Sequence, residues 1–260
     1  EERLLMDQIT LTADDDVVGT EMLAVCVGLN GIPDLRTVPV PQPSEDEVLI
    51  KVLRSGICNT DLEILNGYMG FKGVLGHEFV GKVVLENGHK EWAGKTVVGD
   101  INLACRSETC PVCIKGGDIA RNHCPNRTVM GILNQQGCHA EYIALPCSNL
   151  HEVPTEITDE AAVFCEPLAA ACRILEQGLI SPQDQVAILG DGKLGLLIAE
   201  VLSRRQQPNS TADKPPPVVL FGRHPERMAL LQGLAECRLA KPSSSSDCCP
   251  PAPPPGSDGR

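Results

Sequence analysis

The stretch QVAILGDGKLGLLIAEVLSR, residues 185–204, decides the fold of the second half of the chain. Its first five residues predict a short buried strand, and the apolar residues after its glycines recur at helical spacing. Gly190, Gly192 and Gly195 fit the pattern G-x-G-x-x-G. Between a strand and a helix, such a loop lets backbone N–H groups and the helix N-terminus bind a pyrophosphate. The stretch therefore predicts a dinucleotide-binding loop in a parallel, doubly wound sheet.

A second strand at 217–221 and a helix at 226–236 are predicted next, which continues the alternation of an α/β fold. An NAD site places an acid at the end of this second strand, where it binds the ribose 2′-hydroxyl. Here Gly222 and Arg223 follow the strand instead. Gly222 leaves space and Arg223 brings positive charge, so the pair favours the 2′-phosphate of NADP. The alternative is that Arg223 is an ordinary solvated cation of a loop.

The first half of the chain carries short strands punctuated by Gly and Pro, which predict a compact β-barrel-like domain. A Pro-rich turn region is expected at 32–43. The pattern changes near Thr158, which with Asp159 offers an N-cap to a helix predicted over 160–177. The predicted strands of this half are 22–28, 47–53, a stretch within 74–85, and 95–101.

Four cysteines lie within twenty residues, and the middle pair forms a CxxC motif. Four thiolates at such spacing can close a tetrahedral zinc site with no open coordination position, so its role would be structural. The alternative is a set of unpaired, partly buried cysteines, which is harder to explain in a loop. The four residues are Cys105, Cys110, Cys113 and Cys124.

A second group of residues suits a catalytic zinc, which needs fewer protein ligands and one open position. Cys58 offers a thiolate and His77 an imidazole, while Asp61 could orient the second ring nitrogen of His77. Thr60 carries a hydroxyl close enough to pass on a proton. Glu166 stands before a proline in an apolar helix, where a cation such as a metal would offset its burial. Each residue alone also fits a structural role: a core cysteine, a satisfied histidine, a solvated acid.

Composition excludes several classes of protein. The formal net charge of -12 argues against a nucleic-acid binder, which needs a basic face. No apolar run approaches the roughly 20 residues of a membrane span. Thirteen cysteines in a chain without a secretory signal favour metal binding over disulfides, and we expect a cytoplasmic protein. An acidic leader, a polar insertion at 206–217 and a Pro/Ser-rich tail are predicted as surface or disordered segments.

Together these motifs resemble the medium-chain, zinc-dependent alcohol and polyol dehydrogenase family, over about residues 22–237. Cys58, Thr60 and Asp61 look like the family's first zinc ligand, its proton-relay hydroxyl and the acid that orients a ligand. The run Gly76-His77-Glu78 looks like its GHE zinc signature, which adds Glu78 to the candidate metal residues. The four-cysteine loop resembles the family's structural zinc lobe with wider gaps than usual.

Two further positions refine the resemblance. Glu166 falls where polyol and threonine dehydrogenases have a Glu and many alcohol dehydrogenases have a Cys, which favours the polyol-type subgroup. Glu63 stands where the family often has the His that ends the proton relay, and this is a departure from its pattern.

The resemblance implies an α/β plus β architecture, in which a GroES-like β-barrel catalytic domain is followed by a partial Rossmann, doubly wound domain. A full family member continues through further strands, so we expect a C-terminally truncated chain. The expected parts are an acidic disordered leader, the zinc-binding catalytic domain, the partial dinucleotide-binding domain and a disordered tail, at residues 1–21, 22–160, 161–237 and 238–260.

The implied chemistry is hydride transfer between NADP (or NAD) and a small-molecule alcohol, polyol or carbonyl substrate. Zinc would bind the alcohol oxygen and lower its pKa, and Thr60 would relay the proton. No membrane or nucleic-acid partner is implied, and a homo-oligomer is compatible with the family. Two alternatives stay open: a truncated, catalytically inactive zinc-binding protein, and a zinc-ribbon nucleic-acid module, which the acidic charge disfavours.

Overall fold

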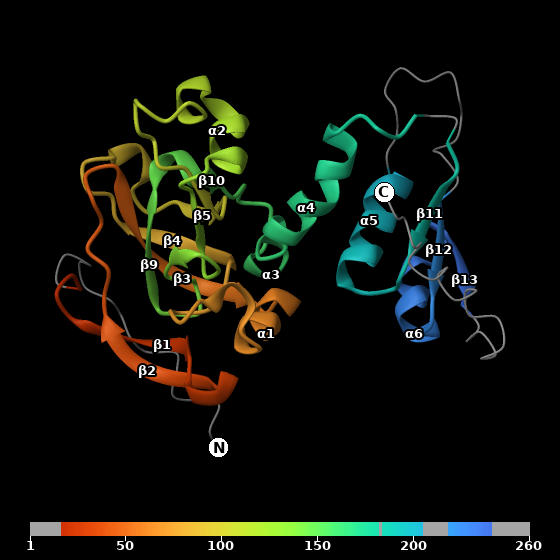
Figure 1. Cartoon of the computed structure of the whole chain (residues 1–260), viewed down its shortest axis with the longest axis horizontal. Helices are drawn as coiled ribbons and strands as arrows, with labels where there is room; N and C mark the ends of the chain where they lie inside the picture. The colour runs from red at the N-terminus through yellow and green to blue at the C-terminus, as the bar shows by residue number, and fades with distance from the viewer. Residues whose placement is uncertain (1–16, 182–183, 205–217, 241–260) are drawn as a thin grey trace, which may run out of the picture. The chain divides into compact units, whose positions relative to one another are not determined.

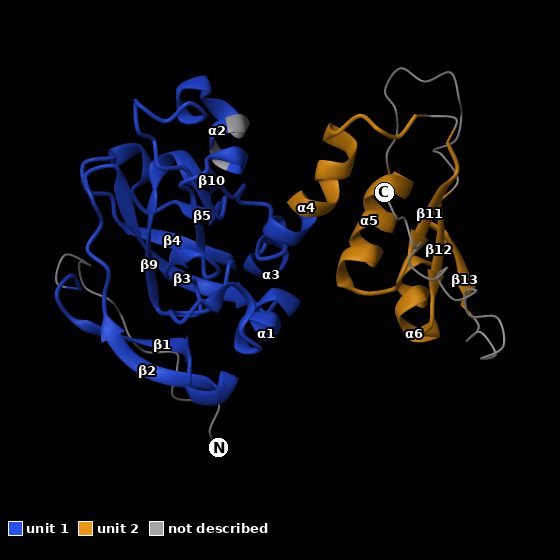
Figure 2. Ribbon diagram, in the orientation of Figure 1, with its two compact units in different colours: residues 1–168 blue, residues 169–260 orange. Residues whose placement is uncertain are grey.

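The computed structural model describes residues 17–181, 184–204 and 218–240. The chain divides into two compact units, residues 1–168 and 169–260 (Figures 1 and 2). Most of the predicted acidic leader, the predicted insertion at 206–217 and most of the predicted tail lie outside the described residues.

The first unit is built on a five-stranded antiparallel sheet that curls into a half-barrel, in the order β10-β5-β4-β3-β9. β3 and β4 are the longest strands and pair along most of their length, with bulges that bend β3. The prediction of a GroES-like β domain is confirmed by this sheet. Its strands are β3 (Glu47–Gly56), β4 (Glu78–Leu85), β5 (Thr96–Gly99), β9 (Tyr142–Pro146) and β10 (Leu150–Glu152).

A separate antiparallel hairpin joins β1 (Glu21–Val27) to β2 (Pro33–Pro39). The expectation of a turn region at 32–43 is therefore wrong, because most of that segment is a strand. Its prolines stand at the first and last positions of β2, where a strand tolerates the loss of a backbone N–H. The residues between them pair with β1, as Ala24 does with Arg36.

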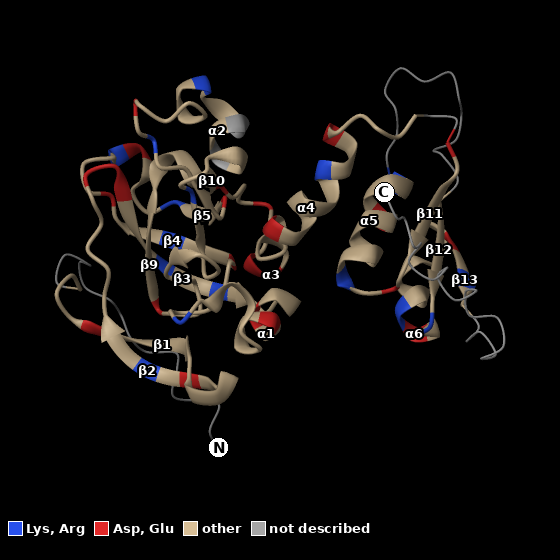
Figure 3. Cartoon of the chain, in the orientation of Figure 1, with Lys and Arg blue, Asp and Glu red and all other residues tan. Residues whose placement is uncertain are grey.

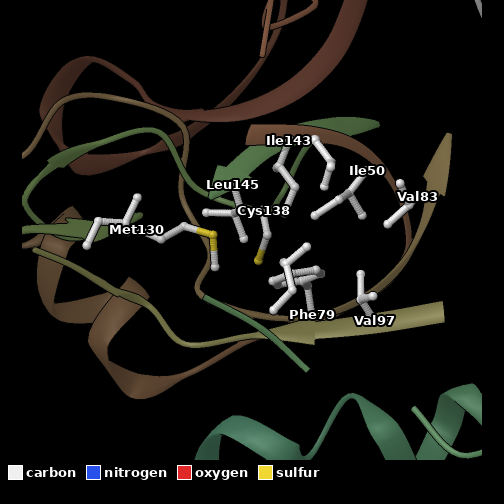
Figure 4. Close-up of a cluster of buried hydrophobic side chains, with 11 residues drawn as sticks. Ile50, Phe79, Val83, Val97, Met130, Cys138, Ile143 and Leu145 are labelled. Atoms are coloured by element: carbon white, nitrogen blue, oxygen red, sulfur yellow. The ribbon is translucent and has the colours of Figure 1, made fainter. Parts of the chain in front are cut away.

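The core of the first unit fills the curl of the five-stranded sheet (Figure 4). Val48 and Ile50 of β3 face this cluster, and both are fully buried. Leu49, between them, is also fully buried but packs on the opposite face against Met22 and Tyr142. Both faces of β3 are thus covered, which explains its unbroken apolar run. The cluster also includes Phe79, Val83, Val97, Met130, Cys138, Ile143 and Leu145.

The cysteine-rich loop leaves the barrel between two short strands of a three-stranded sheet, which has the order β6-β7-β8. The loop carries the 3₁₀ helix η5 (Cys113–Lys115) and the helix α2 (Gly117–His123). The strands of this sheet are β6 (Asn102–Leu103), β7 (Thr128–Met130) and β8 (Asn134–Gln135).

The helix predicted over 160–177 forms in two pieces, α3 (Asp159–Ala162) and α4 (Cys165–Glu176). Thr158 caps the first piece as expected, because its hydroxyl accepts a hydrogen bond from the backbone N–H of Ala161. Pro167 explains the interruption: it has no N–H for the carbonyl of residue 163, so it is tolerated only in the first turn of a new helix.

The second unit is a parallel sheet in the order β11-β12-β13, with α5 (Lys193–Arg204) packed against it. Its strands are β11 (Val186–Leu189), β12 (Val218–Gly222) and β13 (Glu236–Leu239). The first two strands and α5 agree with the predicted strand–helix–strand order. The long helix predicted over 226–236 is wrong: only α6 (Pro225–Met228) and the 3₁₀ helix η7 (Ala229–Leu231) form, and β13 follows.

Four further 3₁₀ helices belong to the first unit, together with the helix α1. Lys and Arg are interspersed with Asp and Glu on the elements of both units (Figure 3). Across the described ranges, no helix has the length and apolar character needed to cross a membrane. The remaining elements are α1 (Asn59–Leu65), η2 (Leu29–Gly31), η3 (Tyr68–Gly70), η4 (Lys90–Trp92) and η6 (Cys147–Asn149).

Candidate metal centres and dinucleotide loop

The first candidate metal centre lies where β3 ends and β4 begins. Because the two strands are antiparallel, Gly56 at the end of β3 stands opposite Glu78 at the start of β4. Cys58 follows β3 and precedes α1, and His77 immediately precedes β4. One ligand atom each of Cys58, His77 and Glu78 lies within 4.8 Å of the others. His77 and Glu78 are buried, and Cys58 is half-buried.

Asp61 ties the two ligand-bearing segments together. Its Oδ2 accepts a hydrogen bond from the backbone N–H of Cys58 at 2.8 Å, and its Oδ1 accepts one from Gly76 at 3.1 Å. Oδ1 also lies 3.5 Å from Nδ1 of His77. The sequence predicts that Asp61 orients this ring nitrogen, and the structure brings the two side chains together. The backbone bonds add a role that the sequence did not predict.

Asp61 and His77 each favour the charged form of the other side chain. Burial alone would raise the pKa of Asp61, but its hydrogen bonds with His139, His77 and Cys58 hold that pKa well below the ordinary value. Burial alone would lower the pKa of His77, but the hydrogen bond and charge of Asp61 raise it to about 9. An ionised carboxylate therefore stands behind the imidazole.

His139 is a neighbour that sequence reasoning missed. Its Nε2 lies 3.8 Å from Oδ2 of Asp61, and its Nδ1 lies 2.9 Å from Oγ of Ser55. Ser55, Asp61 and His139 line a cavity of about 470 Å³ whose other walls are mainly apolar. His139 comes from the turn before β9, far from both ligand segments in sequence, and no spacing rule connects it with them.

Thr60 and Glu166 lie at the margin of this centre. Oγ1 of Thr60 is 3.6 Å from Sγ of Cys58, and Thr60 lines a second cavity of about 340 Å³. Glu166, in the first turn of α4, stays outside the set of ligand atoms within 4.8 Å. Burial raises the pKa of Glu166, the charge of His77 opposes this shift, and the charge of Glu78 adds to it. Glu166 is therefore close enough to His77 and Glu78 to feel both charges.

The donor set of this centre fits a zinc ion. Thiolate, imidazole and carboxylate are the ligands that zinc takes in proteins, and three of them leave one coordination position for a substrate or water. Nδ1 of His77 is buried and lies 3.5 Å from Oδ1 of Asp61. In zinc sites a ligating His typically donates a hydrogen bond from its second ring nitrogen to a carboxylate.

The second candidate centre is the cysteine lobe, residues 105–124. The four Sγ atoms of Cys105, Cys110, Cys113 and Cys124 lie within 4.8 Å of one another. Two of the sulfur–sulfur distances are 3.6 Å, for Cys105 and Cys113, and 4.0 Å, for Cys110 and Cys124. A tetrahedron with zinc–sulfur bonds of about 2.3 Å has edges of about 3.8 Å, so this cluster has the dimensions of a zinc–thiolate site.

The protonation of these thiols also calls for a cation. The backbone N–H of Cys105 hydrogen-bonds the thiolate of Cys124 and lowers its pKa to about 7. Backbone hydrogen bonds from Cys113 and Val112 lower the pKa of Cys110. Desolvation and the neighbouring thiols instead raise the pKa of Cys113 to about 12. The site thus favours the thiolate form of some cysteines and disfavours four thiolates together. A bound divalent metal would offset the negative charge of all four.

The glycines of the predicted dinucleotide loop stand between β11 and α5. Gly190 has a positive φ of 108°, and a Cβ on Gly195 would lie 2.1 Å from the carbonyl oxygen of Gly190. Gly192 has open space around it. These are the features that a tight turn, close packing of helix on strand and the approach of a pyrophosphate require. Arg223 is exposed and shares with Gly190 and Gly192 the lining of a cavity of about 440 Å³.

The curled antiparallel sheet with its two candidate metal-ligand clusters, together with a parallel G-x-G-x-x-G unit, resembles the fold of zinc-binding dehydrogenases. Residues 44–155 match the family model of the alcohol dehydrogenase GroES-like domain. The resemblance to the medium-chain, zinc-dependent alcohol and polyol dehydrogenases is thereby confirmed.

Curated relatives and solved structures agree with this assignment. The chain is 38% identical over 186 residues to an L-threonine 3-dehydrogenase of Streptomyces coelicolor, which covers 66% of this chain and 51% of that protein. It is similar to an alcohol dehydrogenase (rspB) from Escherichia coli CFT073 in complex with NADH, with a TM-score of 0.73 and 27% identity over 86% of this chain and 64% of that one. The chain spans about half the length of the curated relatives it matches.

A zinc-binding dehydrogenase from Sinorhizobium meliloti bound to NADP gives a TM-score of 0.70. It is 30% identical and covers 88% of this chain and 64% of that chain. Similar folds in this family therefore hold either nicotinamide cofactor.

Proposed function

We propose that this chain carries the zinc-binding part of an oxidoreductase that transfers a hydride between NAD(P) and a small alcohol or polyol, or its carbonyl counterpart. One observation carries the proposal: Cys58, His77 and Glu78 converge around a common point, with the hydroxyl of Thr60 beside the thiol and the carboxylate of Asp61 behind the imidazole. Such a set has the ligands of a catalytic zinc and an adjacent group for proton transfer.

We assign the roles as follows. Cys58 and His77 hold the zinc, with Glu78 or Glu166 as the third ligand. When bound, the metal supplies Lewis-acid polarisation of an alcohol or carbonyl oxygen. The hydroxyl of Thr60 passes the substrate proton to solvent through the cavity that it lines with Glu63 and Tyr68. Asp61 holds the ring of His77 in one orientation, and Cys105, Cys110, Cys113 and Cys124 hold a structural zinc.

The cofactor part of the proposal rests on the second unit. Gly190, Gly192 and Gly195 give the pyrophosphate a backbone cradle at the start of α5. Arg223 supplies positive charge where an NAD site has an acid, so we propose NADP as the preferred cofactor. Both NADH and NADP occur in the similar solved structures.

The cellular setting completes the proposal. The chain has thirteen cysteines, and two candidate metal-ligand clusters include five of them, which suits metal binding in a reducing compartment such as the cytoplasm. Self-association into a homo-oligomer is the remaining expectation, and the elution volume of the purified chain measures it.

Zinc analysis combined with an activity assay tests the proposed function. The anaerobically purified chain should hold two zinc ions, of which His77→Ala should remove one. NADPH oxidation should be assayed with a panel of aldehydes, ketones and ketoses, and Thr60→Val should lower any turnover while leaving the zinc content unchanged. Absence of zinc from the wild type would exclude the proposal.

A further inference from the structure

We propose that Asp191 is the residue that determines cofactor specificity in the dinucleotide loop, because its carboxylate fills the space in which the acid of an NAD site would stand. This inference rests on the proposed binding of NAD(P) by the second unit. It assigns a role to the second residue of the G-x-G-x-x-G motif, a position that the motif leaves unspecified.

Asp191 bridges the two loops that form the site. Its Oδ2 accepts hydrogen bonds from the backbone N–H groups of Arg223 at 2.9 Å and His224 at 2.6 Å. Nδ1 of His224 lies 3.0 Å from Oδ1 of the same carboxylate. Asp191 is buried, with 5% of its surface exposed. The carboxylate therefore fixes the segment after β12 to the segment after β11.

The same carboxylate explains why residue 222 is a glycine. A Cβ at Gly222 would lie 2.6 Å from Cβ, Cγ and Oδ2 of Asp191, closer than such atoms come in real proteins. Gly222 has no positive φ, so its backbone conformation would accept other residues. The steric exclusion comes from Asp191, and the hydrogen bonds with Arg223 and His224 prevent Asp191 from moving aside.

An acid at position 222 would meet a second obstacle, which is charge. The side-chain hydrogen bond with His224 and the two backbone hydrogen bonds hold the pKa of Asp191 well below its ordinary value, so this carboxylate is ionised. A second carboxylate beside it would be repelled. The sequence around residue 222 thus selects against the acid that binds an unmodified ribose.

The remaining residues of the cavity favour the phosphorylated ribose. Arg223, His224 and Arg227 all line the cavity of about 440 Å³ that also includes Gly190 and Gly192. Asp191 orders the backbone from which Arg223 and His224 project. A 2′-phosphate can then bind the guanidinium groups of Arg223 and Arg227 in a charge-assisted manner.

The test compares four proteins in direct binding of NADP and NAD: the wild type, Gly222→Asp, Asp191→Gly and the double variant. We expect Gly222→Asp alone to weaken the binding of both cofactors. Asp191→Gly combined with Gly222→Asp should bind NAD at least tenfold more tightly than Gly222→Asp alone does. Asp191→Asn combined with Gly222→Asp is the matched control: it removes the charge but keeps the obstructing atoms, so it should not restore NAD binding.

Thermal stability, measured without cofactor, tests the same contact if a variant binds NADP and NAD poorly. Gly222→Ala adds only a methyl group, and it should lower the melting temperature in the wild-type background but not in the Asp191→Gly background. Zinc content should be unchanged in every variant.

If Gly222→Asp alone gains NAD binding, or if Gly222→Ala is as stable as the wild type, Asp191 does not exclude the acid. If the wild type binds neither cofactor, both the cofactor proposal and this inference are wrong. If the wild type binds NADP but the effects of the substitutions at 191 and 222 are independent of each other, only the inference is wrong.

Discussion

At the residue scale, one carboxylate organises the candidate catalytic centre. Asp61 accepts backbone hydrogen bonds from Cys58 and Gly76, and it faces the imidazoles of His77 and His139. Each contact constrains a segment that carries a candidate ligand or its neighbour. Removal of the negative charge of Asp61 should therefore lower the zinc affinity of the site, although Asp61 is not a proposed ligand.

We predict that Asp61→Asn weakens one of the two zinc sites by about 10–100-fold, the usual effect of removing a partner of a ligating His. Titration of the two-zinc protein with a chromogenic chelator, until both zinc ions are removed, measures this loss of affinity. Asp34→Asn is the control, because Asp34 is exposed and forms an ion pair with Arg36 of the same hairpin. Equal zinc affinities in Asp61→Asn and the wild type would contradict the role given to Asp61.

Arg223→Ala should weaken NADP binding more than NAD binding, by roughly 1–3 kcal/mol for a charge-assisted hydrogen bond to the 2′-phosphate. Calorimetric titration with both cofactors measures the difference. Arg204→Ala serves as the control, since Arg204 is exposed at the end of α5 and pairs with Glu200. Equal losses for the two cofactors would remove the argument for NADP.

The residues that sequence reasoning did not find share a physical cause. Cys58, Thr60, Asp61 and His77 could be predicted because their chemistry and short spacing match a zinc-ligand pattern. His139 could not, since its partner Asp61 comes from a distant segment and only the fold brings them together. Asp191 occupies an unspecified position of its motif, and its importance appears only when Gly222 is adjacent in space.

At the scale of the element, the cysteine lobe is a loop that Arg106 anchors near its first cysteine. Arg106, next to Cys105, forms ion-pair and hydrogen-bond contacts with Asp46 and Ser148 on the body of the first unit. It also donates to Oδ1 of Asn149 at 3.2 Å. These contacts attach the lobe at its base, while the cluster of thiols organises the rest.

Cys110→Ser should remove about one zinc ion per chain and disorder the lobe, because a structural zinc supplies folding free energy directly. Zinc analysis gives the first result, and hydrogen exchange over residues 105–124 gives the second. Cys147→Ser is the matched control, since Cys147 is half-buried and outside both ligand clusters. A lobe that stays protected without its zinc would show that protein contacts alone hold it.

Element predictions failed where tertiary pairing or local chemistry overrides the sequence pattern. β2 was predicted as a turn because of its prolines, yet pairing with β1 makes it a strand. β13 was not predicted: its first residue, Glu236, ended the predicted helix, and Arg238 and Leu239 were placed in the predicted disordered tail at 238–260, because this segment forms its strand only by parallel pairing with β12. The strands β1, β3 and β11 and the helix α5 were predictable because their apolar spacing is unambiguous.

At the scale of the whole molecule, each unit has its own buried cluster. Leu145 belongs to the cluster of the first unit, and Leu220 to that of the second. Both metal-ligand clusters lie in the first unit, at residues 58–78 and 105–124. The two units should therefore respond separately to changes in packing and in metal.

We predict two unfolding transitions, of which only one depends on zinc. Leu145→Ala should destabilise the zinc-dependent transition and Leu220→Ala the other, each by about 2–5 kcal/mol as expected for a buried leucine. Denaturant titration with and without a chelator, read by circular dichroism, separates them. A single transition that shifts equally in both variants would mean that the units unfold together.

The hydrogen bonds of Asp61 have a consequence for the order of assembly. Asp61 links the backbone of Cys58 to that of Gly76, next to His77, so we predict that these two segments need no ion to hold them together. A zinc ion that binds there would not have to order the chain, and its loss would leave the fold of the first unit intact. The ion in the cysteine lobe is instead part of what shapes that loop. Dialysis against cobalt should therefore exchange the first ion well before the second, which would give a coloured, half-substituted protein whose absorption reports on the site near Thr60.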